Sequence, residues 1–86
     1  MSKRGSDRKV SDERILLEFL LSPDPALFTS EVSEPLPLSR QRVNGLLDQL
    51  EENGFVTSKT ASGRRLWWMT PKGKKKVTEA ARNKLT

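Results

Sequence analysis

The side chains best suited to binding chemistry stand together in one short segment, residues 39–44. Arginine, glutamine and asparagine are the residue types that pair bidentately with the edges of guanine and adenine. A serine at the start of a helix can cap it, and the helix N-terminus behind it is a natural site for a phosphate. The polar members of the segment are Ser39, Arg40, Gln41, Arg42 and Asn44. These residues are candidates for contact with a nucleic acid.

Charge is strongly segregated along the 86 residues, which carry a net charge of +5. Residues 12–34 contain six acids against Arg14 alone, whereas residues 59–76 contain no acid. The cations of the second segment are Lys59, Arg64, Arg65, Lys72, Lys74, Lys75 and Lys76. This distribution predicts one positive end of the fold and favours a polyanionic partner. The alternative is that the lysines only keep a small protein soluble.

Several kinds of chemistry are disfavoured by composition. The chain has no histidine, cysteine or tyrosine, and it lacks a glycine-rich phosphate loop. Disulfides, thiolate metal sites and catalysis by histidine, cysteine or tyrosine are therefore excluded, and no acidic pair has the spacing of metal ligands. We predict a protein that is not an enzyme, takes no cofactor or metal and shows no evident small-molecule site. The basic start lacks the apolar stretch of a secretory signal and no apolar run spans a bilayer, so we expect a cytoplasmic, nucleoid-associated protein.

The length allows one domain, which we place at residues 11–86 after a flexible basic N-terminal arm, residues 1–10. Apolar spacing predicts a first helix from the Ser11 cap to Pro23, and a very short helix over residues 30–34. The strongest helix is predicted over residues 40–53, with Gly54 as its left-handed stop. A last helix begins at Pro71 after a Thr70 cap. Its thin apolar stripe consists of Val77, Ala80 or Ala81, and Leu85.

Strands are predicted in the second half of the chain. Residues 55–59 and 65–69 are β-prone and are joined by the turn-rich segment 60–64, so they should pair antiparallel. Leu27 and Phe28 form a single short strand-like stretch. The fold class is therefore α+β and mostly α: a three-helix core, a two-stranded hairpin and an additional C-terminal helix.

Two motifs in this order resemble the winged helix-turn-helix regulators of bacteria and archaea, including small archaeal and MarR-like members. Residues 38–56 look like the recognition helix of that family running into its first wing strand. Residues 67–73, which read WWMTPKG, are similar to the aromatic, aliphatic, Thr, any, any, Gly pattern that closes the wing. The resemblance covers roughly Asp12 to Leu85. It implies a sequence-specific regulator of double-stranded DNA that acts by occupying an operator as a repressor.

The resemblance assigns roles to the polar candidates. The recognition helix 39–53 would enter the major groove with its N-terminal half, and the wing 57–68 would touch the minor groove or the backbone. The predicted DNA-binding residues are Ser39, Arg40, Gln41, Arg42, Asn44, Lys59, Arg64, Arg65 and Lys72. Base contacts are expected foremost from Arg40, Gln41 and Asn44. The alternative for each is an ordinary solvated surface residue.

The apolar residues raise the question of a partner. Trp67 and Trp68 point to opposite faces of a strand, and the family pattern places Trp67 inside and Trp68 outside or half-covered. The first helix is apolar around almost its whole circumference, which is more than one small core needs. We therefore expect a homodimer through the first and the C-terminal helix, which fits a palindromic site.

Two further readings remain open at this stage. Zα domains bind left-handed DNA, and Arg40, Asn44 and Trp67 stand at positions similar to theirs. However, Asp48 occupies the place of their tyrosine, and Arg64 and Arg65 replace their prolines. The other alternative is a winged-helix module that docks onto protein through the wing and Trp68. The absence of acids from the wing disfavours this alternative, because a protein-docking surface does not need charges of one sign.

Overall fold

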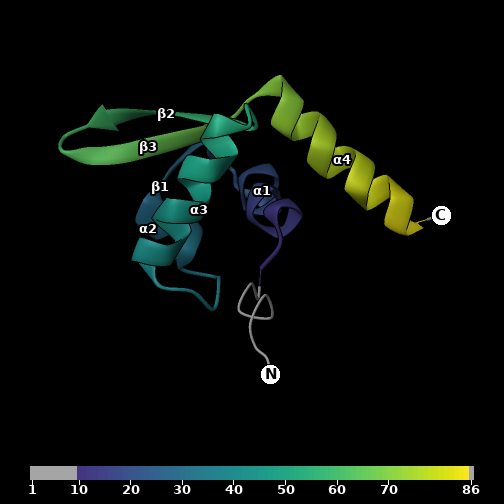
Figure 1. Ribbon diagram of the computed structural model, residues 1–86, viewed down its shortest axis with the longest axis horizontal. Helices are drawn as coiled ribbons and strands as arrows, with labels where there is room; N and C mark the ends of the chain where they lie inside the picture. Colours follow the sequence, from purple (N-terminus) through teal and green to yellow (C-terminus); the bar gives the residue numbers. More distant parts are fainter. Residues whose placement is uncertain (1–9, 86) are drawn as a thin grey trace.

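The computed structural model describes residues 10–85, with side chains through Asn83. The elements follow in the predicted order (Figure 1). They are α1 (Asp12–Leu21), β1 (Ala26–Phe28), α2 (Thr29–Ser33), α3 (Arg40–Glu52), β2 (Val56–Ala61), β3 (Arg64–Met69) and α4 (Pro71–Leu85). Of the predicted arm, residues 1–9 lie outside the described residues. Val10 is 4% exposed and joins the core, so the packed part begins one residue earlier than the sequence indicates.

The strands form one antiparallel sheet in the order β1-β3-β2. β1 pairs with the edge of β3 that β2 leaves open, and Leu27 lies opposite Trp67. The short strand thus extends the predicted two-stranded hairpin to three strands. The predicted linker 60–64 is wrong in length, because β2 continues to Ala61 and β3 resumes at Arg64. Ser62 and Gly63 alone turn the chain, with φ of 55° and 75°. Two consecutive positive φ values make the tight turn that matches the twist of a hairpin.

The helix α3 forms where the sequence predicts it. The Ser39 hydroxyl accepts from the backbone N–H of Arg42 at 3.0 Å, which satisfies one of the open donors of the first turn. Gly54 follows the helix with φ of 82°. The inward face is formed by Val43, Leu46, Leu47 and Leu50, all buried. Because this face is fixed in the core, the polar residues of the first turn are held at the surface.

The core lies between the helices and one face of the sheet. Trp67 is 0% exposed and is the largest fully buried side chain, whereas Trp68 is half-buried, as predicted. α1 contributes Ile15, Leu16 and Phe19. The short helix α2 runs over Thr29–Ser33, one residue earlier than predicted, and buries Val32. Leu36 is buried and Leu38 packs at the edge of the core.

The helix α4 is joined to the rest by close backbone contact. A Cβ atom built on Gly73 would lie 2.0 Å from the backbone oxygen of Phe55, so only glycine allows this approach. Thr70 Oγ1 accepts from the N–H of Gly73, which confirms the predicted cap. Val77 is buried, Ala80 is half-buried and Ala81 is exposed, while the side chain of Leu85 lies outside the described residues. Among residues 10–85, no helix is long and apolar enough to cross a membrane.

Candidate nucleic-acid interface

The first turns of α3 present polar side chains away from the core. Arg40, Gln41 and Arg42 are exposed, and Asn44 is half-buried. Within residues 10–83 the side chains of the first three take part in no ion pair or hydrogen bond. Their donors are therefore open to a ligand at the positive end of the helix dipole.

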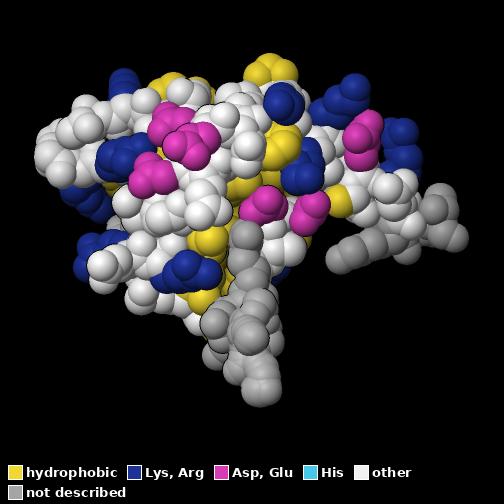
Figure 2. Space-filling model, in the orientation of Figure 1, with side chains coloured by type: hydrophobic (Ala, Val, Ile, Leu, Met, Phe, Trp, Pro, Cys, Tyr) yellow, Lys and Arg dark blue, Asp and Glu magenta, His cyan; other side chains and the backbone are white. Residues whose placement is uncertain are grey.

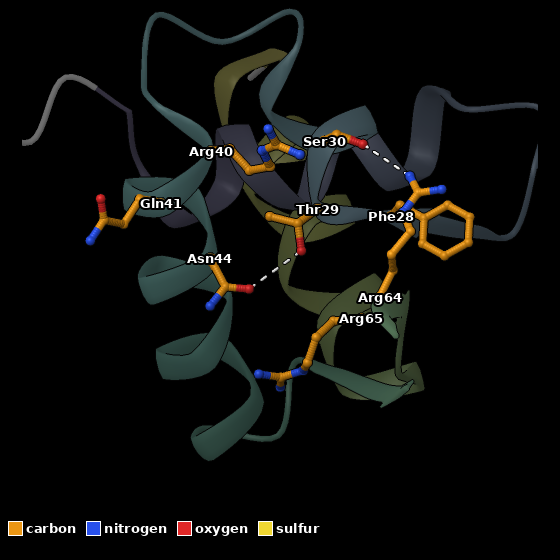
Figure 3. Close-up of a pocket in the computed structure, with 8 residues that line it drawn as sticks. All are labelled: Phe28, Thr29, Ser30, Arg40, Gln41, Asn44, Arg64 and Arg65. Carbon is orange, nitrogen blue, oxygen red and sulfur yellow. Dashed lines mark hydrogen bonds between the residues drawn. The ribbon is translucent and has the colours of Figure 1, made fainter. Parts of the chain in front are cut away.

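A hollow of about 320 Å³ lies where α2, α3 and the hairpin meet. Figure 3 shows side chains from all three elements around it, with the Gln41 amide pointing away from the others. The residues that line it are Phe28, Thr29, Ser30, Arg40, Gln41, Asn44, Arg64 and Arg65. The lining contains three arginines and no acid, so it suits a group rich in hydrogen-bond acceptors.

Arg64 stands beside the hairpin turn and leans back toward the helices. Its guanidinium lies 3.9 Å from the centre of the Phe28 ring and donates to Ser30 Oγ at 3.3 Å. The residue remains exposed. These contacts fix the direction of Arg64 while most of its five N–H donors stay open.

Arg65 also lines the hollow, but it is held by acids of α3. Its guanidinium lies 3.0 Å from Asp48 Oδ1 and 3.1 Å from Glu51 Oε1, and it covers the Trp67 ring at 4.2 Å. Ser58 accepts from Arg65 and donates to Glu51. Acidic side chains gather beside cationic ones over the hairpin and α3 on the face shown in Figure 2. Arg65 thus joins the hairpin to α3, a role that its neighbour Arg64 does not share.

The two lysines of the predicted set lie apart from the hollow. Lys59 is exposed on β2, opposite Leu66 of β3. Lys72 donates to the backbone oxygen of Asn53 at 2.9 Å and lies 5.1 Å from the centre of the Phe55 ring. It therefore complements the C-terminal end of α3, about 20 Å along the helix from Arg40. Around the hollow the structure brings together neither lysine but five other predicted residues: Arg40, Gln41, Asn44, Arg64 and Arg65.

Sequence reasoning missed the residues that support the site from below. Thr29 is buried between Trp67 and Asn44 and hydrogen-bonds to both. Ser30 and Phe28 hold Arg64. The sequence places Phe28 in a short strand and Ser30 at the start of a short helix, and it indicates no role for Thr29. A threonine at a helix start gives no sign of such contacts, because they depend on partners 15 and 38 residues away.

The pKa of Glu13 is shifted at a place outside the hollow, where α1 packs against α4. Glu13 accepts backbone hydrogen bonding at the start of α1, and Lys76 lies 3.3 Å from its Oε2. The backbone hydrogen bond first, and then Lys76, lower the pKa of Glu13 below its usual 4.5. This pair stabilises the helix contact and takes no part in the hollow.

Solved structures share this fold. Sso10a-2, a DNA-binding protein from Sulfolobus solfataricus, matches with a TM-score of 0.67 at 24% identity, over 90% of this chain and 85% of that one. The C30S mutant of Lactococcus lactis ZitR in complex with DNA matches with a TM-score of 0.64 at 25% identity, over 95% and 57%. Bordetella bronchiseptica BpsR, whose DNA binding is regulated by 6-hydroxynicotinic acid, gives 0.65 at 16% identity, over 87% and 55%.

The fold is therefore a winged helix, with the β2–β3 hairpin as the wing, which confirms the predicted fold class. The structural neighbours are DNA-binding proteins. The chain spans most of Sso10a-2 but little more than half of BpsR and ZitR. No protein-family model matches the sequence, and no curated protein matches it significantly.

Proposed function

We propose that this protein binds double-stranded DNA sequence-specifically and regulates transcription, with the first half of α3 in the major groove and the wing on the minor groove or backbone. The observation that carries the proposal is the set of open donors at the start of α3, beside an arginine of the wing and over an acid-free hollow. The winged-helix neighbours, one of them bound to DNA, support it. As an intracellular DNA-binding protein it would reside on the nucleoid.

The proposal distributes the contacts according to the geometry. Arg40, Gln41 and Asn44 read bases, because they project from the first turns of the helix that enters the groove. Ser39 and Arg42 contact phosphates at the helix N-terminus. Arg64 and Lys59 supply the wing contacts. Arg65 and Lys72 belong to the same surface set but act mainly by holding the scaffold, since both already have internal partners.

The test is binding to a pool of random duplex DNA across a salt series. The expected result is an enriched motif for the wild type, in which Arg40→Ala and Asn44→Ala each abolish the base preference at the position that the residue reads. Arg64→Ala should weaken binding to all sequences and lower the salt slope by about 0.9 if it contacts one phosphate. Lys75→Ala is the matched control, because it removes an exposed cation of α4 outside the site. Absence of binding even at low salt would overturn the proposal and favour protein docking.

Regulation would follow from occupancy alone. A bound domain of this size covers an operator and blocks access to an adjacent promoter, so the proposed mode is repression. Footprinting on genomic DNA tests this, with protection expected next to promoters. Protected sites remote from every promoter would contradict the regulatory part while leaving DNA binding intact.

We also propose a homodimer through α1 and α4. Leu20 and Leu21 of α1 are 41% and 69% exposed, and burial of such side chains favours association. Two copies related by a two-fold axis would present two α3 helices to a palindromic site. Sedimentation equilibrium should show a dimer that Leu21→Lys dissociates and Gln49→Lys, at an exposed polar position of α3, does not. A wild type that is monomeric at all concentrations would contradict this.

Binding of left-handed DNA in the manner of a Zα domain would need an exposed aromatic side chain, and Trp67 does not provide one. Trp67 is 0% exposed and lies beneath Arg65, so it cannot stack on a ligand. Asp48, at the position of the Zα tyrosine, is paired with Arg65. The proposal is therefore limited to ordinary right-handed duplexes.

A further inference from the structure

Two hydrogen bonds in series connect the buried centre of the wing to α3. Trp67 Nε1–H of β3 donates to Thr29 Oγ1 of α2 at 2.8 Å. Thr29 Oγ1 donates in turn to Asn44 Oδ1 of α3 at 3.4 Å. Trp67 is fully buried and Thr29 is 9% exposed. The series therefore runs from the core to the wall of the hollow, and Asn44 is its last member.

The direction of the series is set by Trp67. An indole N–H can only donate, so the Thr29 hydroxyl must accept from it. The single hydrogen of that hydroxyl then needs an acceptor, and among residues 10–83 the acceptor it reaches is Asn44 Oδ1. A flipped amide would place Nδ2, another donor, against the hydroxyl and leave this nearly buried hydrogen unpaired, which is unfavourable.

The orientation of the Asn44 amide follows from this. Figure 3 shows its oxygen turned toward Thr29 and its nitrogen turned away from it. We propose that Trp67 and Thr29 are positioning residues that fix Asn44 as a hydrogen-bond donor, so that it reads a base edge offering acceptors. Guanine, with O6 and N7, offers such an edge in the major groove. The inference rests on the proposed function.

Adenine is disfavoured by the same geometry. The bidentate contact of asparagine with adenine needs Oδ1 to accept from N6 while Nδ2 donates to N7 along one outward edge. Here Oδ1 is turned inward to Thr29, so the donor N6–H₂ of adenine would meet a second donor. The residue type alone allows either adenine or guanine, and the buried series selects between them.

The experiment compares base preferences of the wild type, Thr29→Val and Thr29→Ser, selected from a random duplex pool. The position read by Asn44 is the one whose preference disappears in Asn44→Ala. The wild type and Thr29→Ser should both prefer guanine over adenine there. Thr29→Val has nearly the same shape but no hydroxyl, which frees the amide to turn over. Its preference for guanine over adenine at this position should fall about fivefold.

Two controls separate this effect from loss of folding. Thr29→Val leaves the Trp67 N–H unpaired and lowers stability, so binding is measured below its unfolding temperature. Weakened folding reduces the affinity for all sequences equally, whereas a freed amide changes the preference at one position. In the Asn44→Ala background, Thr29→Val should change no base preference.

A wild type that selects adenine at the Asn44 position would overturn the inference. So would a Thr29→Val variant that keeps the preference of Thr29→Ser, or an Asn44→Ala variant that weakens all sequences equally, as a phosphate contact would. Failure of the proposed function is a different result. In that case the wild type enriches no duplex at all, and this inference falls with it.

Discussion

The cations at the two ends of α3 differ in whether they have partners inside the protein. At the first turn, Arg40 and Arg42 are exposed and have no internal partner within residues 10–83. At the other end Arg65 is held by Asp48 and Glu51, and Lys72 is held by the Asn53 carbonyl. The difference comes from the acids, which stand only in the second half of the helix and pair with Arg65, and from the backbone carbonyl at its C-terminal end, which accepts from Lys72. One half of α3 is therefore available to a polyanion, while the other half is part of the framework that positions it.

The largest effect is expected at Gly73 of α4, which packs beside the C-terminal end of α3. The methyl group of Gly73→Ala would lie 2.0 Å from the Phe55 backbone oxygen, so the start of α4 must shift. We expect a loss of about 3 kcal/mol in the free energy of unfolding. Chemical denaturation measures it.

Gly45→Ala is the matched control, because nothing lies within 4 Å of the added Cβ atom in the middle of α3. This change should stabilise the protein by about 1 kcal/mol through helix propensity. Equal stability of the two variants would show that the contact at Gly73 is not tight.

The next largest effect is expected on DNA binding, at Arg40 in the first turn of α3. Arg40→Gln removes a charged donor that has no internal partner, so the affinity for the selected duplex should fall about tenfold. The free energy of unfolding should change by less than about 0.5 kcal/mol. Fluorescence anisotropy with labelled duplex and thermal unfolding check the two expectations. A variant that loses stability but keeps its affinity would reverse the contrast between the two ends of α3.

Arg65→Ala tests whether Arg65 holds the wing against α3 or contacts DNA directly. Loss of the network with Asp48 and Glu51 should destabilise the fold by about 1 kcal/mol, since the ions are only partly buried. Binding should weaken a few-fold for all sequences because the wing is no longer held against α3. The salt slope of binding should stay unchanged, since the charge is already paired. A slope lowered by about 0.9 would identify a phosphate contact instead.

The smallest effect is a pH dependence at the α1–α4 contact. The pKa of Glu13 is lowered in the folded state, so its contribution to stability is present above the unfolded value of 4.5. The contribution is lost as the pH falls through the lower folded value. Wild type should therefore be slightly more stable than Glu13→Gln near neutral pH, and the difference should vanish in acid. Thermal unfolding of both proteins from about pH 7 down to about pH 3 tests this. A difference that grows in acid would contradict the sign.

Local sequence signals determined the elements of this fold. Ser39 and Gly54 mark the two ends of α3, because a cap and a left-handed stop each act on backbone groups only a few residues away. The alternation along β3 predicted that Trp67 and Trp68 point to opposite faces, and the family resemblance assigned Trp67 to the inside. The segment of open donors at residues 39–44 could also be located, because the apolar stripe of α3 fixes which side faces outward.

The tertiary structure decided the roles of individual donors. Arg64 and Arg65 are adjacent and chemically alike, and both line the hollow, yet Arg64 packs on Phe28 while Arg65 pairs with Asp48 and Glu51. The orientation of the Asn44 amide depends on Thr29 and Trp67, which are distant in sequence. Composition and periodicity carry information over one or two turns of chain. Which charge is compensated and which amide atom faces outward depend on partners that meet only when α2, α3 and the wing pack together.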